Sequence, residues 1–164
     1  MTRTTELDDP LAGVRHRAPA PGETGVDLGL LSDLTGFSVK LVWILGHGLL
    51  AREFAETGIT PHRYSMLEVI GRNPGLQQTQ LAAALALTRP ATTLAVDFWE
   101  ERGCVERHTI VGDRRSFGVY PTLHGEKELK RLRALVRKAD AALTAGLSEA
   151  ETAELRRLLK KIHR

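Results

Sequence analysis

Apolar residues recur at intervals of three and four between Asp33 and about Glu56, which predicts a long helix in residues 31–58. Three further apolar positions widen the stripe, namely Val42, Leu50 and Phe54. We therefore expect this helix to bury more than one face. Gly58 ends it. Residues 1–30 contain three prolines and little apolar periodicity, so we expect an irregular arm there.

Three shorter helices are predicted in the middle of the chain. Thr60 and Pro61 suit an N-cap and the first position of a helix that ends at Asn73-Pro74-Gly75. A short alanine-rich helix follows from Gln78 to about Leu85. Thr88 then caps a helix that runs to Arg102 and ends at Gly103. Its apolar residues should pack inward: Leu94, Phe98 and Trp99.

The pattern changes after that glycine. Residues 104–111 and 117–120 favour two strands around a polar turn at 112–116, which is a β-hairpin. In residues 122–164 the spacing is helical again, with an apolar seam at heptad-like intervals on a long helix. The seam consists of Leu129, Leu132, Val136, Ala139 and Leu143. Ser148 and Glu151 form a capping-box pattern for a last helix with Leu155, Leu158, Leu159 and Ile162 on one stripe.

Composition sets the broad class. The 164 residues include 42% hydrophobic and 26% charged residues, which is typical of a globular protein. We see no secretory signal and no apolar run long enough to span a membrane, and the single Cys104 allows no internal disulfide, so we expect a cytoplasmic location. The net charge of +3 is too small to indicate a nucleic-acid partner by itself, and the positive excess lies in residues 122–164.

Enzyme chemistry has little support. The sequence has no glycine-rich phosphate loop, no nucleophile elbow and no histidine pair at metal-ligand spacing on one helix face. We therefore expect neither an enzyme nor a protein with a cofactor or a metal site.

Two short helices joined tightly and followed by a hairpin describe a winged helix-turn-helix, whose second helix presents its N-terminal residues to the DNA major groove. The residues at that exposed start are Thr88, Arg89, Thr92 and Thr93. Gln78 and Thr79 can hydrogen-bond phosphates from the supporting helix. The turn contributes Asp113, Arg114 and Arg115, and arginine suits the negative potential of a minor groove.

Residues 77–125 resemble the MarR family of transcriptional regulators, and residues from Thr60 to the C-terminus do so more loosely. The matching segments are LQQTQLAAALALTRPATT, FWEERGCVER and DRRSFGVYPTLHG. The DRRS turn placed after the ERGCVER helix end is the specific part of the match. Pro121 departs from the leucine usual in the family, and we expect it to end the second strand.

The resemblance implies a mainly α fold with a small β-hairpin wing. It implies a homodimer held by N- and C-terminal dimerisation helices (31–58 and 122–164), with the winged helix-turn-helix in 59–121 placed for a palindromic operator on double-stranded DNA. Asp113 and Arg115 match the wing aspartate and the minor-groove arginine of the family. Members commonly repress transcription and are released by a small ligand, often aromatic, bound between the dimerisation helices and the winged region.

Candidate ligand-binding residues follow from that implication. An aromatic acid, or a derivative such as its coenzyme A thioester, would need aromatic walls and a few polar groups. The sequence offers Phe37, Trp43, His47, His62, Tyr64 and Met66. The alternative for these residues is that the aromatics belong to the dimer core and the histidines to the surface.

Two other functions remain open at this point. One is a small-molecule-binding or protein-interaction dimer that keeps the fold without binding DNA. The other is a redox-switched regulator acting through Cys104, although its position between a helix end and a strand favours a buried structural cysteine.

Overall fold

The computed structural model describes residues 25–110 and 113–162, with side chains placed for all of them except 113–116. Helices dominate. In chain order the elements are the 3-10 helix Gly29–Asp33, α1 (Thr35–Phe54), the 3-10 helix Ala55–Thr57, α2 (Pro61–Arg72), β1 (Leu76–Gln77), α3 (Gln78–Leu85), α4 (Arg89–Glu101), β2 (Val105–Ile110), β3 (Asp113–Pro121), α5 (Leu123–Leu143) and α6 (Glu149–Ile162). The predicted order of helices around one hairpin is confirmed.

The chain divides into two compact units, Met1–Trp43 and Ile44–Arg164, with the boundary inside α1. The predicted arm, residues 1–30, falls mostly outside the described residues. What is described of the first unit is the 3-10 helix and the first half of α1, where none of the side chains is buried. The expectation that α1 buries more than one face is wrong for the single chain, because Phe54 is the one buried residue of this helix.

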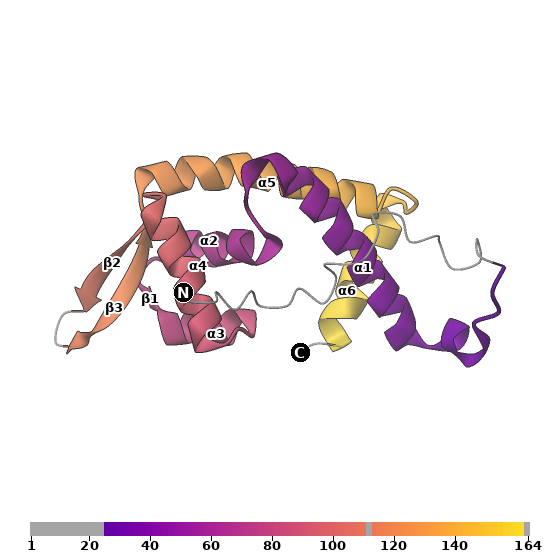
Figure 1. Cartoon of the computed structure of the whole chain (residues 1–164). Helices are drawn as coiled ribbons and strands as arrows, with labels where there is room; N and C mark the ends of the chain where they lie inside the picture. The colour runs from indigo at the N-terminus through magenta and orange to yellow at the C-terminus, as the bar shows by residue number, and fades with distance from the viewer. Residues whose placement is uncertain (1–24, 111–112, 163–164) are drawn as a thin grey trace, which may run out of the picture. The chain divides into compact units, whose positions relative to one another are not determined.

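The core of the second unit lies among α2, α3, α4 and α5 and the sheet (Figure 1). Leu67 and Ile70 of α2, Val96 of α4 and Leu132 of α5 have no exposed surface. Trp99 anchors this core, because its ring is 1% exposed while its Nε1 donates a hydrogen bond to the Arg63 carbonyl oxygen at 2.8 Å. Burying an indole without such an acceptor would be costly.

The sheet has three antiparallel strands in the order β1-β3-β2. Sequence analysis missed β1, because two residues, Leu76 and Gln77, are too few to show a strand periodicity. They pair with Val119 and Gly118 of β3 and so join the start of α3 to the wing. The second strand of the hairpin begins earlier than predicted, at Asp113, and ends at Pro121 as expected.

The predicted caps are present. Thr60 and Thr88 accept hydrogen bonds from Arg63 N and Ala91 N at the starts of α2 and α4. Ser148 and Glu151 form the capping box of α6, with Glu151 N donating to Ser148 Oγ at 3.3 Å and Ser148 N donating to Glu151 Oε2 at 2.8 Å. Because these bonds satisfy orphan donors locally, the helix starts could be located from the sequence.

Close packing fixes the junction between the wing and α5. Thr122 caps α5 and donates from Oγ1 to the Gly103 carbonyl oxygen at 2.6 Å. A Cβ at Gly125 would lie 1.9 Å from the Cys104 carbonyl oxygen, so only glycine fits at this position. The PTLHG segment therefore locks the start of α5 against the end of α4.

Candidate DNA-binding surface

A tight turn positions α3 against α4. α3 ends at Ala86, whose backbone is left-handed with φ of +51°, and α4 starts after Thr88. A left-handed alanine costs roughly 1–2 kcal/mol, and two backbone hydrogen bonds from Ala86 N and one from Leu87 N hold the turn. The turn leaves the N-terminal ends of both helices at the surface, where Thr79, Thr88 and Arg89 are exposed.

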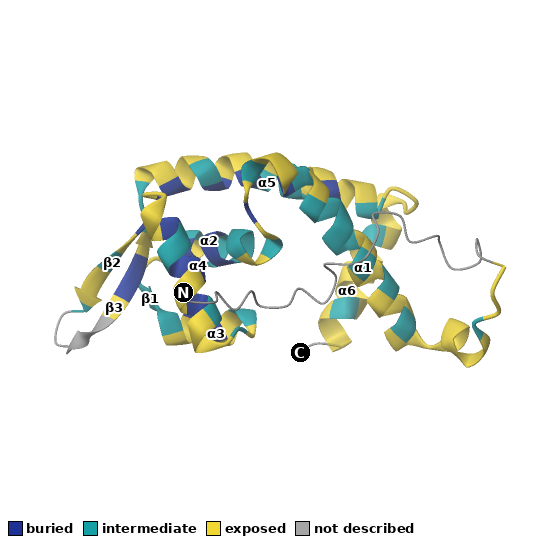
Figure 2. Cartoon of the chain, viewed as in Figure 1, coloured by how far each residue is buried: buried dark blue, intermediate teal, exposed yellow. Residues whose placement is uncertain are grey.

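Burial divides α4 into two faces. Thr92, Ala95, Val96 and Trp99 are buried, whereas Thr93 and Leu94 are exposed (Figure 2). Two expectations are therefore wrong. Thr92 has no exposed surface and donates its hydroxyl to the Thr88 carbonyl oxygen at 3.0 Å, so it cannot reach a groove, and Leu94 points outward with 63% of its surface exposed. Both errors arise because the helix meets the core through residues 92, 95, 96 and 99, with Phe98 packed partly against it, and not through Leu94.

Arg107 on β2 connects the wing to α4. Its guanidinium forms ion pairs with Asp97 and Glu100, and its side chain is 20% exposed. Gln78 of α3 joins the cluster, because its amide oxygen accepts from Arg107 Nη2 at 2.9 Å in the orientation that satisfies both groups. The Thr93 hydroxyl lies 3.4 Å from the other polar atom of the same amide. One cation thus joins three elements and neutralises two carboxylates of α4.

A hollow of about 460 Å³ opens beside this cluster. The start of α3, the exposed side of α4 and the sheet all contribute to its lining: Gln77, Gln78, Thr79, Thr93, Asp97, Arg107 and Phe117. Hydroxyl and amide groups dominate the polar part of this lining, and such groups hydrogen-bond phosphate oxygens. The hollow lies between the exposed face of α4 and the wing.

At the wing tip, residues 113–116 are described only in their backbone. Asp113 pairs with Ile110, with a register shift between Thr109 and Ile110. The side chains of Asp113, Arg114 and Arg115 lie outside the described part of the chain, so their predicted DNA contacts stay predictions. Phe117 of β3 and its partner Thr109 of β2 are both exposed.

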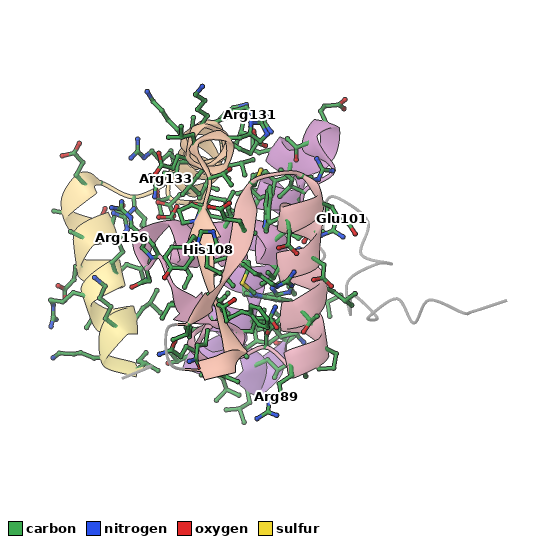
Figure 3. The ribbon with its side chains drawn as sticks, turned by 90° about the vertical axis from the view of Figure 1, so that its left-hand side faces the viewer. Arg89, Glu101, His108, Arg131, Arg133 and Arg156 are labelled. Carbon is green, nitrogen blue, oxygen red and sulfur yellow. The ribbon has the colours of Figure 1, made fainter. Side chains whose placement is uncertain are left out.

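An ion pair ties α2 to Arg133 of α5, which is labelled in Figure 3. Arg133 donates from Nε and Nη2 to the two oxygens of Glu68 at 2.8 and 2.9 Å, and Tyr64 donates from its hydroxyl to Glu68 at 3.2 Å. The hydrogen bonds from Arg133 hold the pKa of Glu68 below its ordinary value. Burial, followed by the charge of Glu68, raises the pKa of Tyr64.

The candidate ligand residues are divided between the two units. Met66 has no exposed surface and belongs to the core, so it packs the winged region and does not line an accessible pocket. Tyr64 is half-buried and bonded to Glu68, while His62 is exposed. Phe37 and Trp43 belong to the first unit and His47 to the second. Neither the hollow beside α4 nor a second one of about 560 Å³ between α5 and α6 is lined by any of them.

Cys104 is 1% exposed, and burial raises the pKa of its thiol, which disfavours the reactive thiolate. This agrees with the expected structural role. In the part of the chain that the structure describes, no group of three or more His, Cys, Asp or Glu side chains could hold a metal ion, and no helix is long and apolar enough to cross a membrane.

Sequence reasoning missed Arg107 and Leu94. Arg107 stands in the ERGCVER segment that carried the family resemblance, but no spacing rule pairs a strand residue with Asp97 and Glu100 across a turn. The signal for Leu94 was its position on the helix opposite residues 92, 96 and 99, which a strict 3.6-residue count would have shown.

Known proteins match the chain over most of its length. The MarR family model matches residues 57–116. A transcriptional regulatory protein assigned to the hcr operon of Thauera aromatica is 36% identical over 153 residues, which is 92% of either chain. The chain belongs to the MarR family. The prediction of a transcriptional regulator instead of an enzyme thus holds at the family level.

Solved structures of MarR proteins share the fold. The transcriptional repressor CouR, bound to a 23-mer DNA duplex, is similar with a TM-score of 0.79 and 30% identity, covering 85% of this chain and 99% of CouR. A MarR family protein of Mycobacterium tuberculosis in complex with salicylic acid is similar with a TM-score of 0.66 and 27% identity, covering 79% of this chain and 96% of that one. The predicted winged helix-turn-helix architecture is confirmed.

Proposed function

We propose that this MarR protein is a ligand-responsive repressor that binds a palindromic operator as a homodimer and is released by a small aromatic acid or by its coenzyme A thioester. The α4 surface carries the proposal. Its N-terminal half begins with Arg89 and has one exposed face, and the first turns of α3 and α4 contain no acidic residue. Helix N-termini attract anions, so both ends suit DNA phosphates.

The charge arrangement supports an approach to DNA. Asp97 and Glu100 would repel phosphates, but both are paired with Arg107. Residues 77–121 carry five arginines and five carboxylates, and because Arg107 pairs with two of the carboxylates, four arginines, Arg89 among them, are left against three carboxylates. The similarity to CouR, which was solved on a DNA duplex, favours the same use of this surface.

Exposed apolar side chains support the homodimer. Leu155, Leu158 and Ile162 form one stripe on α6 and are 36%, 44% and 68% exposed in the single chain. The first unit and α1 add Leu31, Val42 and Trp43, all more than 40% exposed. Apolar stripes of this kind mark interfaces, so we assign residues 31–58 and 122–164 to contacts with a second copy.

The aromatic effector has weaker support. A relative was solved with salicylic acid, and the candidates that remain in this chain are Phe37, Trp43, His47, His62 and Tyr64. Release would follow from a population shift, in which the ligand prefers a dimer whose recognition helices are wrongly spaced for successive major grooves. A hundredfold loss of occupancy needs a preference of roughly 2.7 kcal/mol.

The test begins with selection of an operator from random duplexes by the purified protein. Specific binding is then titrated against salt, aromatic acids and their coenzyme A thioesters. We expect a palindromic operator and release by one compound class. If no compound weakens operator binding, the protein is a regulator that does not respond to these ligands. If no operator is selected at low salt, the alternative of a dimer that does not bind DNA is favoured.

Arg115→Ala tests the wing in the same assay. We expect operator affinity to fall by about 1–3 kcal/mol with the dimer intact. Arg131→Ala is the matched control, because Arg131 is an exposed arginine of α5 on the opposite side of the winged region from Arg89 (Figure 3). Equal losses in both variants would indicate a general charge effect instead of a wing contact.

A further inference from the structure

An exposed leucine stands in the middle of the surface assigned to DNA. Leu94 is 63% exposed, whereas the other large apolar residues of α4 are partly or fully buried, with Val96 at 0% and Trp99 at 1%. It follows Thr93 by one residue, and both are exposed, as is Arg89 in the first turn of the helix. A leucine side chain here neither packs the core nor forms a hydrogen bond.

The polar groups next to Leu94 are largely committed within the protein. Thr88 uses its hydroxyl to cap α4, Thr92 is buried, and Thr93 donates to the Arg89 carbonyl oxygen at 3.1 Å. Hydrogen-bonded readout of bases needs donors and acceptors that are not already used. The outward side of α4 therefore offers Arg89 and an apolar surface, in place of a row of polar side chains.

Charge complementarity indicates what covers that apolar surface. The first turn of α4 has a helix N-terminus, Arg89 and no acidic residue. Of the three carboxylates further along, Asp97 and Glu100 are paired with Arg107, and Glu101 lies at the last residue of the helix, seven residues beyond Leu94. Such a surface attracts a polyanion. A polyanion that also offers an apolar group to a helix is double-stranded DNA, whose major groove displays the 5-methyl group of thymine.

We propose that Leu94 is a specificity-determining residue that contacts a thymine methyl group in each half-site of the operator. The proposal rests on the proposed function and adds to it the base that the helix selects. Removing one methyl group from water is worth about 0.8 kcal/mol, which corresponds to roughly fourfold in affinity. A symmetric change in both half-sites should then cost more than about tenfold.

Deoxyuridine provides a direct probe, because it keeps the base pairing of thymine and lacks only the methyl group. Each thymine of the selected operator is replaced by deoxyuridine together with its symmetry mate, and the affinity is measured for the wild-type protein and for Leu94→Ala. We expect one symmetric pair of substitutions to weaken the wild type by about tenfold or more and to change the affinity of Leu94→Ala by less than about twofold.

Two controls separate base contact from other effects. Leu123→Ala removes a leucine that is 79% exposed at the start of α5, and it should keep the full sensitivity to deoxyuridine. Leu94→Met keeps an apolar side chain of similar volume and should also retain much of the sensitivity. Since Leu94 lies at the surface, its variants should fold as the wild type does.

The outcomes are distinct. Wild-type affinity that ignores every deoxyuridine substitution, or a Leu94→Ala protein as sensitive as the wild type, would overturn the assignment while leaving the repressor intact. Selection of no operator would overturn the proposed function and this inference together.

Discussion

Two amphipathic helices of the second unit, α4 and α6, differ in how far their apolar stripes are buried. In α4 the apolar stripe is buried, with Val96 at 0% and Trp99 at 1% exposure. In α6 the stripe is as regular but stays at the surface, where Leu158 is 44% and Ile162 68% exposed. Amphipathic spacing predicts that a helix has a face to bury. It does not say whether the covering surface belongs to the same chain.

The difference explains why the apolar side chains of the winged region are covered within one chain, whereas those of α6 are not. α2, α3, α5 and the sheet surround the buried stripe of α4. Within the described residues, α6 buries no side chain, and one of its ties to α5 is the exposed ion pair between Arg156 and Asp140. Exposed ion pairs contribute little stability, so a second chain is the natural cover for the apolar side of α6.

The strongest test of this comparison places a charge on the α6 stripe. Leu158→Glu should leave the folded winged region in place but weaken dimerisation by roughly a thousandfold or more, since each interface would bury two unpaired carboxylates. Sedimentation velocity across a range of concentrations measures this change. Leu123→Glu is the matched control, being the same substitution at a leucine that is 79% exposed on α5. A dimer unaffected by Leu158→Glu would place the interface elsewhere.

Truncation of a core side chain should lower the free energy of unfolding, whereas the α6 substitution acts on dimerisation. Leu67→Ala removes a fully buried side chain of α2, and we expect a loss of about 2–5 kcal/mol in the free energy of unfolding. Urea denaturation at a fixed protein concentration measures it. Leu94→Ala, at an exposed leucine of α4, should change the same quantity by less than about 0.5 kcal/mol. Similar losses in both variants would contradict the burial described for α4.

Removing Arg107 tests how its ion pairs with α4 contribute to DNA binding. Arg107→Ala leaves Asp97 and Glu100 unpaired next to the duplex, so operator affinity should fall by about 1–3 kcal/mol. Adding Asp97→Asn and Glu100→Gln to the same protein should restore part of the loss if repulsion is the cause. No recovery would show that Arg107 acts by positioning the wing. Fluorescence anisotropy with a labelled operator resolves both outcomes.

The smallest expected effect is a change in how the stability of the fold depends on pH. The pKa of Glu68 is lowered in the folded protein, so its pairing with Arg133 stabilises the fold above the unfolded pKa, near 4.5, and this stabilisation is lost as the pH falls through the folded pKa. Thermal melts of Glu68→Gln should therefore depend less on pH below about 4.5 than those of the wild type. Parallel curves for the two proteins would contradict the pairing.

The sequence by itself determined the order of the helices around the hairpin and the starts of several helices. Thr60, Thr88 and the Ser148–Glu151 pair each cap a helix that starts where the pattern predicted it. These signals are local, because a cap satisfies donors within three residues of itself. The DRRS and ERGCVER segments likewise carried the family, which the relative from Thauera aromatica confirms.

Only the tertiary structure decided which side of each helix is covered and which residues meet across elements. Thr92 is buried and Leu94 is exposed, the reverse of what the sequence predicted, because the core lies against one particular side of α4. The same holds for Arg107 meeting Asp97, for Arg133 meeting Glu68, and for Met66 filling the core. The spacing of apolar residues shows that a helix has an apolar and a polar face. The angle at which the helix packs on its neighbours decides where the boundary between the buried and exposed sides falls.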